Sequence, residues 1–258
     1  MNFMKRFQAI AAYLVVLALS GAVTLKSAEP GKVQGKALVR TVHGTATYSV
    51  GGVAMPLKAN MELEAGTLIT TGPDSYVYVN INGISSSVRV AADTTMAITT
   101  MNCIGSEREG DTETMLDVKA GSILGNVQKV SANSTYEIKT PHGVAGIRGT
   151  DFEITVTQEP DGKYLVTFTS VHGRVFVSAV VNGAIETREL HDGESWCPGA
   201  GDVVPTPLRL LDEYSRLIDE MIAFIQLTHV PSITVPIRPP FPYNNPPGQQ
   251  PSSGSGSP

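Results

Sequence analysis

Two carboxylates, Asp151 and Glu153, lie two residues apart in a run that alternates polar and apolar residues. Successive side chains of a β-strand point to opposite faces, so these acids share one face, as a carboxylate pair does in general acid–base catalysis. The exposed polar face of an antiparallel strand produces the same spacing without any chemistry. We therefore interpret the pair as structural. If a hydrolase activity were found, these two carboxylates would be the positions to mutate.

The residue types that support metal binding or nucleophilic catalysis are not arranged for either. The histidines are scattered without the close spacing of a metal site, at His43, His142, His172, His191 and His229. The sequence contains no G-x-S-x-G nucleophile elbow, phosphate loop or dinucleotide fingerprint. It predicts a protein that is not an enzyme and that has no cofactor or metal.

Two cysteines, Cys103 and Cys197, could pair in an oxidising compartment. Their separation along the chain says nothing about the distance between their Cα atoms, which a disulfide restricts to about 7 Å or less. A disulfide and two buried thiols therefore both remain open.

The first residues have the layout of a secretory signal peptide. Lys5 and Arg6 precede an apolar run over 9–19, and small residues follow. We expect residues 1–28 to be the signal, cleaved after Ala22 or Ala28; an uncleaved anchor is the alternative. No later run is apolar enough to cross a membrane, so the mature chain should have no transmembrane span and be periplasmic or secreted.

The chain is acidic, with a formal net charge of -5. Removal of the signal segment would take away three positive charges and no negative one. An acidic surface repels phosphate backbones, so nucleic acid is not an expected partner.

From about 35 to 204 the sequence is a series of short alternating runs separated by glycine turns, which is typical of an all-β domain. Tight hairpin turns are predicted at 82–83, 161–162 and 182–183. Three similar segments predict a strand, a turn and a returning strand around Gly66, Gly121 and Gly193. We expect a β-sandwich or a rolled, β-helix-like sheet that is rich in antiparallel pairs.

The pattern changes after Pro205. Over 207–228, apolar residues recur every three or four positions, which predicts an amphipathic helix with Pro207 at its start. The stripe consists of Leu210, Leu211, Tyr214, Leu217, Ile218, Met221, Ile222 and Ile225. Such a helix covers an open sheet or, alternatively, binds a partner. Residues 231–258 are rich in Pro, Gly and Ser, which predicts a disordered tail.

The segment TPHGVAGIRGTDFEI, residues 140–154, combines a Pro-Gly entry, an apolar run, an Arg-Gly-Thr turn and an alternating strand. Its glycines allow backbone conformations or close approaches that a side chain would block. Arg148 is expected to pair with Asp151 and to fix the turn. We interpret the notable positions as structural: Thr140, Pro141, Gly143, Gly146, Arg148, Gly149, Thr150 and Asp151.

This segment resembles the signature of the FecR family, the periplasmic domain named for the ferric-citrate regulator of Gram-negative bacteria. The resemblance runs from about Gly35 to Pro198. It includes GTATYS, LEAGTLITTGPDSYVYVNING, LDVKAGSILGNV, VHGRVFV and LHDGESW. It implies an all-β domain of stacked or rolled sheets that acts as a sensing or protein-interaction module.

Typical family members have a cytoplasmic anti-sigma region, a membrane helix and then this domain, which receives a signal from an outer-membrane receptor. Only the first six residues, up to Arg6, could lie in the cytoplasm, so direct control of a sigma factor is not expected. The resemblance leaves an exported domain that binds an envelope protein, either an outer-membrane receptor or an inner-membrane regulator. The alternative is a structural or cell-surface protein that contacts polysaccharide or peptidoglycan.

Overall fold

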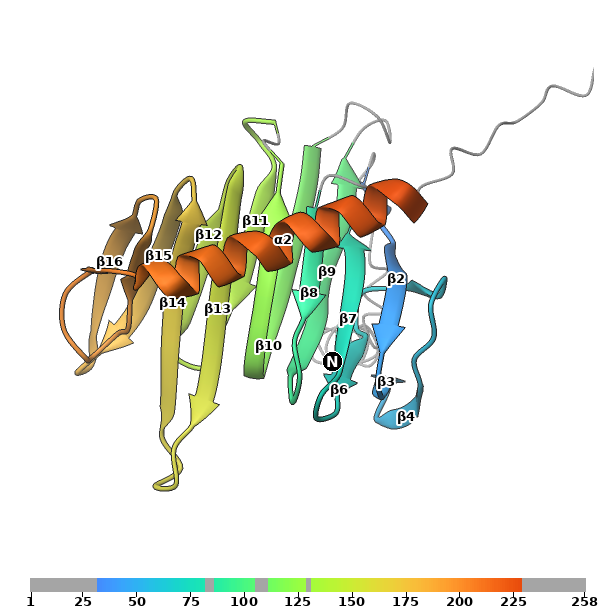
Figure 1. Cartoon of the computed structure of the whole chain (residues 1–258), viewed down its shortest axis with the longest axis horizontal. Helices are drawn as coiled ribbons and strands as arrows, with labels where there is room; N and C mark the ends of the chain where they lie inside the picture. Colours follow the sequence, from blue (N-terminus) through green and yellow to red (C-terminus); the bar gives the residue numbers. More distant parts are fainter. Residues whose placement is uncertain (1–31, 82–85, 105–110, 129–130, 229–258) are drawn as a thin grey trace, which may run out of the picture.

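The computed structural model describes residues 32–81, 86–104, 111–128 and 131–228. The expected signal peptide, the turn at 82–83 and the Pro-rich tail lie outside these residues. The described part is a two-layered β structure with one helix, α2 (Leu208–Thr228), across one of its outer faces (Figure 1). This confirms the predicted all-β class and its C-terminal helix.

Layer A is the sheet that α2 does not cover. Its strands are hydrogen-bonded in the order β4-β3-β6-β9-β10-β11-β12-β15-β16, and β1 pairs with the end of β9. Their bounds are β1 (Lys32–Gln34), β3 (Ala46–Val50), β4 (Val53–Pro56), β6 (Leu68–Thr71), β9 (Thr95–Ile104), β10 (Asp111–Val127), β11 (Thr135–Lys139), β12 (Gly143–Ile147), β15 (Val175–Val181) and β16 (Ala184–Leu190).

Layer B lies beneath α2. Its order is β5-β2-β7-β8-β10-β13-β14-β17-β18. The bounds are β2 (Ala37–His43), β5 (Glu62–Leu63), β7 (Tyr76–Ile81), β8 (Ser86–Val90), β13 (Thr150–Gln158), β14 (Tyr164–His172), β17 (Glu194–Trp196) and β18 (Val204–Pro205). All strand pairs of both layers are antiparallel except β10 with β11.

Strand β10 belongs to both layers, so hydrogen bonding is continuous from one layer to the other. Residues 111–120 pair with β9 in layer A, and residues 121–127 pair with β8 and β13 in layer B. The change occurs at Gly121, which has a φ of 88°. The predicted turn and returning strand at Gly121 are therefore wrong, because the chain passes from layer to layer without reversing. Gly66 and Gly193 do lie in turns, with φ values of 92° and 77°.

The predicted hairpins are confirmed where the structure describes them. Gly162, Asn182 and Gly183 have φ values of 83°, 50° and 81°, as tight turns require. Strands β7 and β8 are antiparallel neighbours, as the expected turn between them implies.

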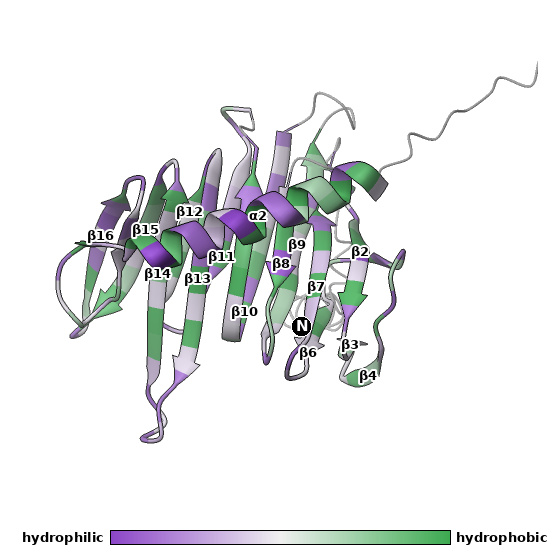
Figure 2. Cartoon of the chain, in the orientation of Figure 1, coloured by the Kyte–Doolittle hydropathy of each residue, from purple (hydrophilic) through white to green (hydrophobic). Residues whose placement is uncertain are grey.

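The core lies between the two layers and is formed by the apolar residues that alternate along each strand. Phe152, Ile154 and Val156 of β13 are buried there, and Phe168 and Trp196 join them from β14 and β17. Figure 2 shows the alternation of hydrophobic and hydrophilic residues along these strands. The polar residues of layer B consequently face outward, toward α2.

Candidate functional site

The outer face of layer B carries the polar side chains that the domain brings together. Strand register places Tyr78, Arg89, Leu124, Glu153, Thr169 and Ser195 side by side on six neighbouring strands. We call this row the helix track, because α2 crosses the strands of layer B (Figure 1) and contacts β8, β10, β13 and β14.

Glu153 lies at the centre of the track and is only 2% exposed. Its Oε1 accepts hydrogen bonds from the Ser122 hydroxyl, at 2.7 Å, and from the Thr155 hydroxyl, and Thr169 also bonds to the carboxyl. Burial raises the pKa of Glu153, and the three hydroxyls oppose that rise only in part. The Glu153 carboxyl is thus a buried acid whose hydrogen-bond donors are all uncharged hydroxyls.

The hydroxyl cluster continues toward the start of α2. The Thr169 and Ser195 hydroxyls are 2.9 Å apart, and Ser195 is 2.5 Å from the Thr206 hydroxyl. On the helix side, burial and the nearby charge of Glu153 raise the pKa of Tyr214 to about 12. The phenol therefore stays protonated at neutral pH.

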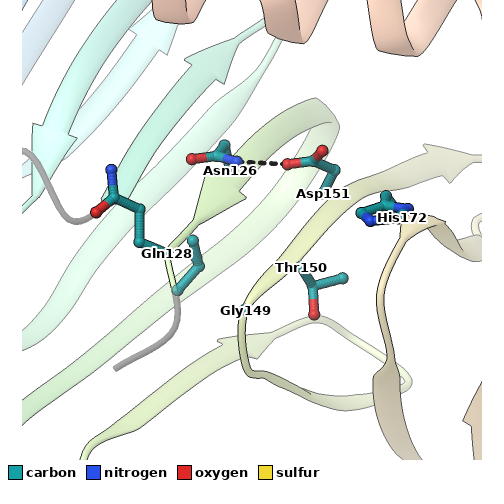
Figure 3. A pocket seen from close by; sticks show the side chains of 7 residues that line it. Asn126, Gln128, Gly149, Thr150, Asp151 and His172 are labelled. Atoms are coloured by element: carbon teal, nitrogen blue, oxygen red, sulfur yellow. Dashed lines mark hydrogen bonds between the residues drawn. The ribbon is translucent and has the colours of Figure 1, made fainter. Parts of the chain in front are cut away.

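A shallow pocket of about 220 Å³ opens beside the track, at the ends of β10, β13 and β14 (Figure 3). Asn126, Asp151 and His172 line it, together with Val127, Gln128, Gly149 and Thr150. The Asn126 amide donates to Asp151 Oδ1 at 2.5 Å. His172 Nδ1 lies 3.5 Å from the carboxylate of Asp192.

Asp151 is the acidic group of this pocket. Burial raises its pKa, the Asn126 hydrogen bond and His172 lower it, and Asp219 of α2 adds a smaller rise. The pocket therefore offers a partly desolvated carboxyl, two amides and an imidazole. Such a group of side chains suits a ligand that donates hydrogen bonds.

The two carboxylates of the predicted pair have different surroundings. Asp151 and Glu153 share the outer face of β13 as expected, but the first lines the pocket and the second is buried among hydroxyls. Sequence reasoning missed Ser122 and Asn126, which contact them. Ser122 precedes the buried Ile123, and Asn126 precedes the buried Val127. Because neighbouring side chains of a strand point to opposite faces, this alternation was the signal that places Ser122 and Asn126 on the outer face.

The signature segment builds one wall of the pocket and its supports. Thr140 Oγ1 donates to the carbonyl of Gly143 and accepts from its amide, which closes the turn at Pro141. Gly143 allows close packing, since a Cβ there would lie 2.4 Å from the carbonyl oxygen of Ser178. Gly146 lies in β12, where a Cβ would make only an ordinary contact, 3.8 Å from the carbonyl oxygen of Phe176.

The end of the segment turns at Gly149, which has a φ of 65°. Thr150 is buried and donates to the carbonyl of Arg174 at 2.8 Å. The expected pair of Arg148 with Asp151 is not made. Arg148 is exposed and forms no ion pair with any described residue. Asp151 accepts a hydrogen bond from Asn126 instead.

Of the two alternatives for the cysteines, the structure does not form the disulfide, and both side chains are half-buried rather than buried. Cys103 lies at the end of β9 in layer A, whereas Cys197 follows β17 in layer B, and no bond joins them. Burial raises the pKa of the Cys197 thiol, so the thiol form is favoured.

Neither a cluster of metal-binding side chains nor a membrane-spanning helix is present among the described residues. None of their His, Cys, Asp and Glu side chains gather in a group of three that could hold a metal ion. No helix in that part of the chain has the length and apolar character needed to span a membrane.

Comparison with known proteins identifies one family. Residues 67–184 match the family described as FecR protein. The match confirms the resemblance read from the sequence, over a narrower range, and it includes the signature segment and β13, the strand that carries Asp151 and Glu153. No curated protein matches the chain.

Among solved structures, two of a candidate anti-sigma factor from Parabacteroides distasonis ATCC 8503 are similar. One has 14% identity and a TM-score of 0.42, and covers 57% of this chain and 63% of that one. The other has 15% identity and a TM-score of 0.44, and covers 57% and 64%. The chain thus spans less than two thirds of the length of these neighbours.

Proposed function

Because residues 67–184 of this chain form a FecR domain, we propose that the protein is a regulatory module that acts by binding another protein in the bacterial cell envelope, and not by catalysis. The N-terminal segment supports export to that compartment. The family match is the observation that carries the proposal.

The pocket beside the helix track supports a binding role, and it is the docking site that this proposal assigns to the partner. The family signature contributes Gly149, Thr150 and Asp151 to it. Asp151 Oδ1 already accepts from Asn126, and a carboxylate has several acceptor positions. A partner residue that donates hydrogen bonds, such as a lysine, arginine or amide, therefore fits. The acidic net charge of the chain also favours a basic partner surface.

The variant Asp151→Asn tests this surface, because it keeps the shape of the side chain and the bond to Asn126 but removes the charge. Hydrogen bonds to charged groups contribute about 1.5–3 kcal/mol, so we expect capture of the envelope partner by purified protein to weaken about tenfold or more. Glu64→Gln, which removes an exposed charge in the turn between β5 and β6, is the matched control.

Equal capture by wild type, Asp151→Asn and the control would exclude the pocket as the docking site. Saturable binding of isolated cell-wall glycan, without a protein partner, would favour the structural or cell-surface role instead.

A further inference from the structure

Layer A ends in a strand whose outer edge is open. β16 lies at one end of the molecule (Figure 1) and, among the described strands, pairs only with β15, since β17 pairs with β14 and β18. β16 has seven residues, whereas the strands at the other ends of the layers are short: β4 has four, and β5 and β18 have two each. Shortness and proline protect edge strands from pairing with other chains. β4 and β18 have both protections, and β16 has neither.

The backbone of β16 has free hydrogen-bonding groups along this edge. Val180 of β15 donates its amide to the carbonyl of His142, on the β12 side. Its pair with Ile185 therefore exchanges no backbone hydrogen bonds. Bonded and non-bonded pairs alternate along two antiparallel strands. The amides and carbonyls of Ile185, Thr187 and Glu189 consequently point away from β15, toward the open edge.

The other face of β16 carries opposite charges two residues apart. Glu186 and Arg188 alternate with the outward-facing residues, and their register partners on β15 are buried. The Arg188 guanidinium donates to the Glu186 carboxylate at 2.8 Å and to the Thr187 carbonyl at 3.2 Å. The Glu186 and Arg188 side chains are 35% and 34% exposed. An ion pair of this exposure stabilises a single chain little, so a second strand can replace both contacts.

Inward-pointing charges normally oppose the pairing of an edge strand. A second copy of β16 that runs antiparallel is an exception, because it supplies the complementary charges itself. Only the two-fold register centred on Thr187 places Glu186 opposite the partner's Arg188 and Arg188 opposite the partner's Glu186. Registers centred on either charged residue would place like charges together, which destabilises a strand pair. The register centred on Thr187 also pairs β16 over its full length.

From the open edge, its free backbone groups and its self-complementary charges, we propose that β16 pairs with β16 of a second copy of this chain. Layer A then continues into the layer A of the partner through a two-fold axis at Thr187. The same surface of each copy makes the contact, so the assembly closes as a dimer. This inference uses residues outside the pocket and does not depend on the proposed envelope partner.

The outward side chains agree with this occupant. Phe176, Val180 and Ile185 are exposed on layer A, and register places Val180 beside Ile185 and Phe176 beside Glu189. Across the axis, Ile185 lies opposite the partner's Glu189, which lies beside the partner's Phe176. The exposed apolar side chains of the two copies thus join into one surface, and Ile185 gains a neighbour on its open side.

Other occupants fit the edge less well. Residues 231–258 of the same chain are rich in proline, which lacks the amide that an added strand must donate. A strand from an unrelated protein would have to match both inward charges of β16 in register. A second copy matches them by symmetry.

Charge reversal tests the pairing, with sedimentation velocity over a dilution series of the purified full chain. We expect the wild type to sediment as a dimer that dissociates on dilution. Glu186→Arg and Arg188→Glu each place like charges opposite each other at both ends of the contact. Each variant alone should raise the Kd of the dimer at least ~10-fold. An equimolar mixture of the two variants restores both opposite-charge pairs and should form a dimer with one copy of each.

Thr187→Pro provides a second test, because Arg188 also lies over the Trp196 ring, 5.3 Å from its centre, and its loss can affect folding. The proline removes an amide that points away from β15, so it blocks pairing and leaves the ladder with β15 intact. Thr187→Val keeps the amide and should remain a dimer.

A wild type that is monomeric at every concentration would overturn the proposal, even if it bound another protein through β16. A dimer that is unchanged in Thr187→Pro, or a mixture of folded charge variants that stays monomeric, would also overturn it. Unfolding of Thr187→Pro would do the same, because the amide of Thr187 would then bond within the chain.

Discussion

At the scale of single residues, the outer face of layer B holds an acid in an environment that disfavours its charge. The hydrogen-bond partners of Glu153 are the hydroxyls of Ser122, Thr155 and Thr169. Tyr214 above it is also neutral at ordinary pH. Such a group links protein stability to pH, because folding must either bury a charge or retain a proton.

The sign of that linkage is fixed by the direction of the shift. The pKa of Glu153 is raised above its ordinary value of 4.5, so the folded state binds the proton more tightly than the unfolded state. Stability from this group is therefore greatest below pH 4.5 and falls as pH rises toward the folded pKa. The raised pKa of Asp151 acts in the same direction.

We therefore expect Glu153→Gln to raise the free energy of unfolding at pH 7, because it keeps the shape of the side chain and removes a carboxyl whose ionisation burial disfavours. At pH 4 the gain should disappear. Urea unfolding at both pH values measures the effect, and Glu64→Gln is the exposed control. Destabilisation at pH 7 would show that the ionised carboxyl is held more strongly by its three hydroxyls than we infer.

At the scale of elements, β10 determines how the two layers meet. Gly121 has a positive φ, and a Cβ there would lie 2.5 Å from Thr94 Cα and 2.7 Å from the carbonyl oxygen of Asp93. Both contacts are with backbone, which cannot move aside as a flexible side chain can. This glycine lets one strand pass from layer A to layer B.

Gly121→Ala should therefore lower the free energy of unfolding by about 3 kcal/mol or more, from backbone strain of about 1–2 kcal/mol and overpacking of about 1–3 kcal/mol. Gly162→Ala is the matched variant: its φ of 83° is similar, but open space surrounds it. Gly162→Ala should lower the free energy of unfolding only by the amount of the backbone strain. Equal losses in denaturant titrations of the two variants would contradict the contact at Gly121.

Sequence patterns predicted the strands, two described hairpins and the helix stripe, because alternation and periodicity record which side of each element is buried. They predicted a reversal at Gly121, since a positive φ is shared by turns and by this crossing. They treated Glu153 as a member of an exposed strand face, because alternation cannot tell that a helix 55 residues later covers it.

The same limit applies to contacts between distant strands. Arg148 and Asp151 are close in sequence, but Asp151 bonds to Asn126 on β10. Cys103 and Cys197 belong to different layers. No local sequence pattern predicts the Asp151–Asn126 hydrogen bond or the separation of the two cysteines, because both depend on which strands become neighbours.

At the scale of the whole molecule, the two outer faces differ in character. Layer B carries α2, the buried acid and the pocket. Within the described part of the chain no helix covers layer A, and its β15 and β16 expose Phe176, Val180 and Ile185 at 44%, 57% and 78%. We propose that a partner binds on the layer B side, where polar groups converge, and the acidic net charge favours a basic partner there.

Site-specific photocrosslinking in the native host tests that assignment most directly. A crosslinking side chain at Gln128, on the pocket rim directly after β10, is compared with one at Lys119, an exposed residue of β10 at the bulge opposite β9 in layer A. We expect a protein adduct from Gln128 and none from Lys119. Adducts with glycan alone or with copies of the chain alone, or equal protein adducts from both positions, would contradict it.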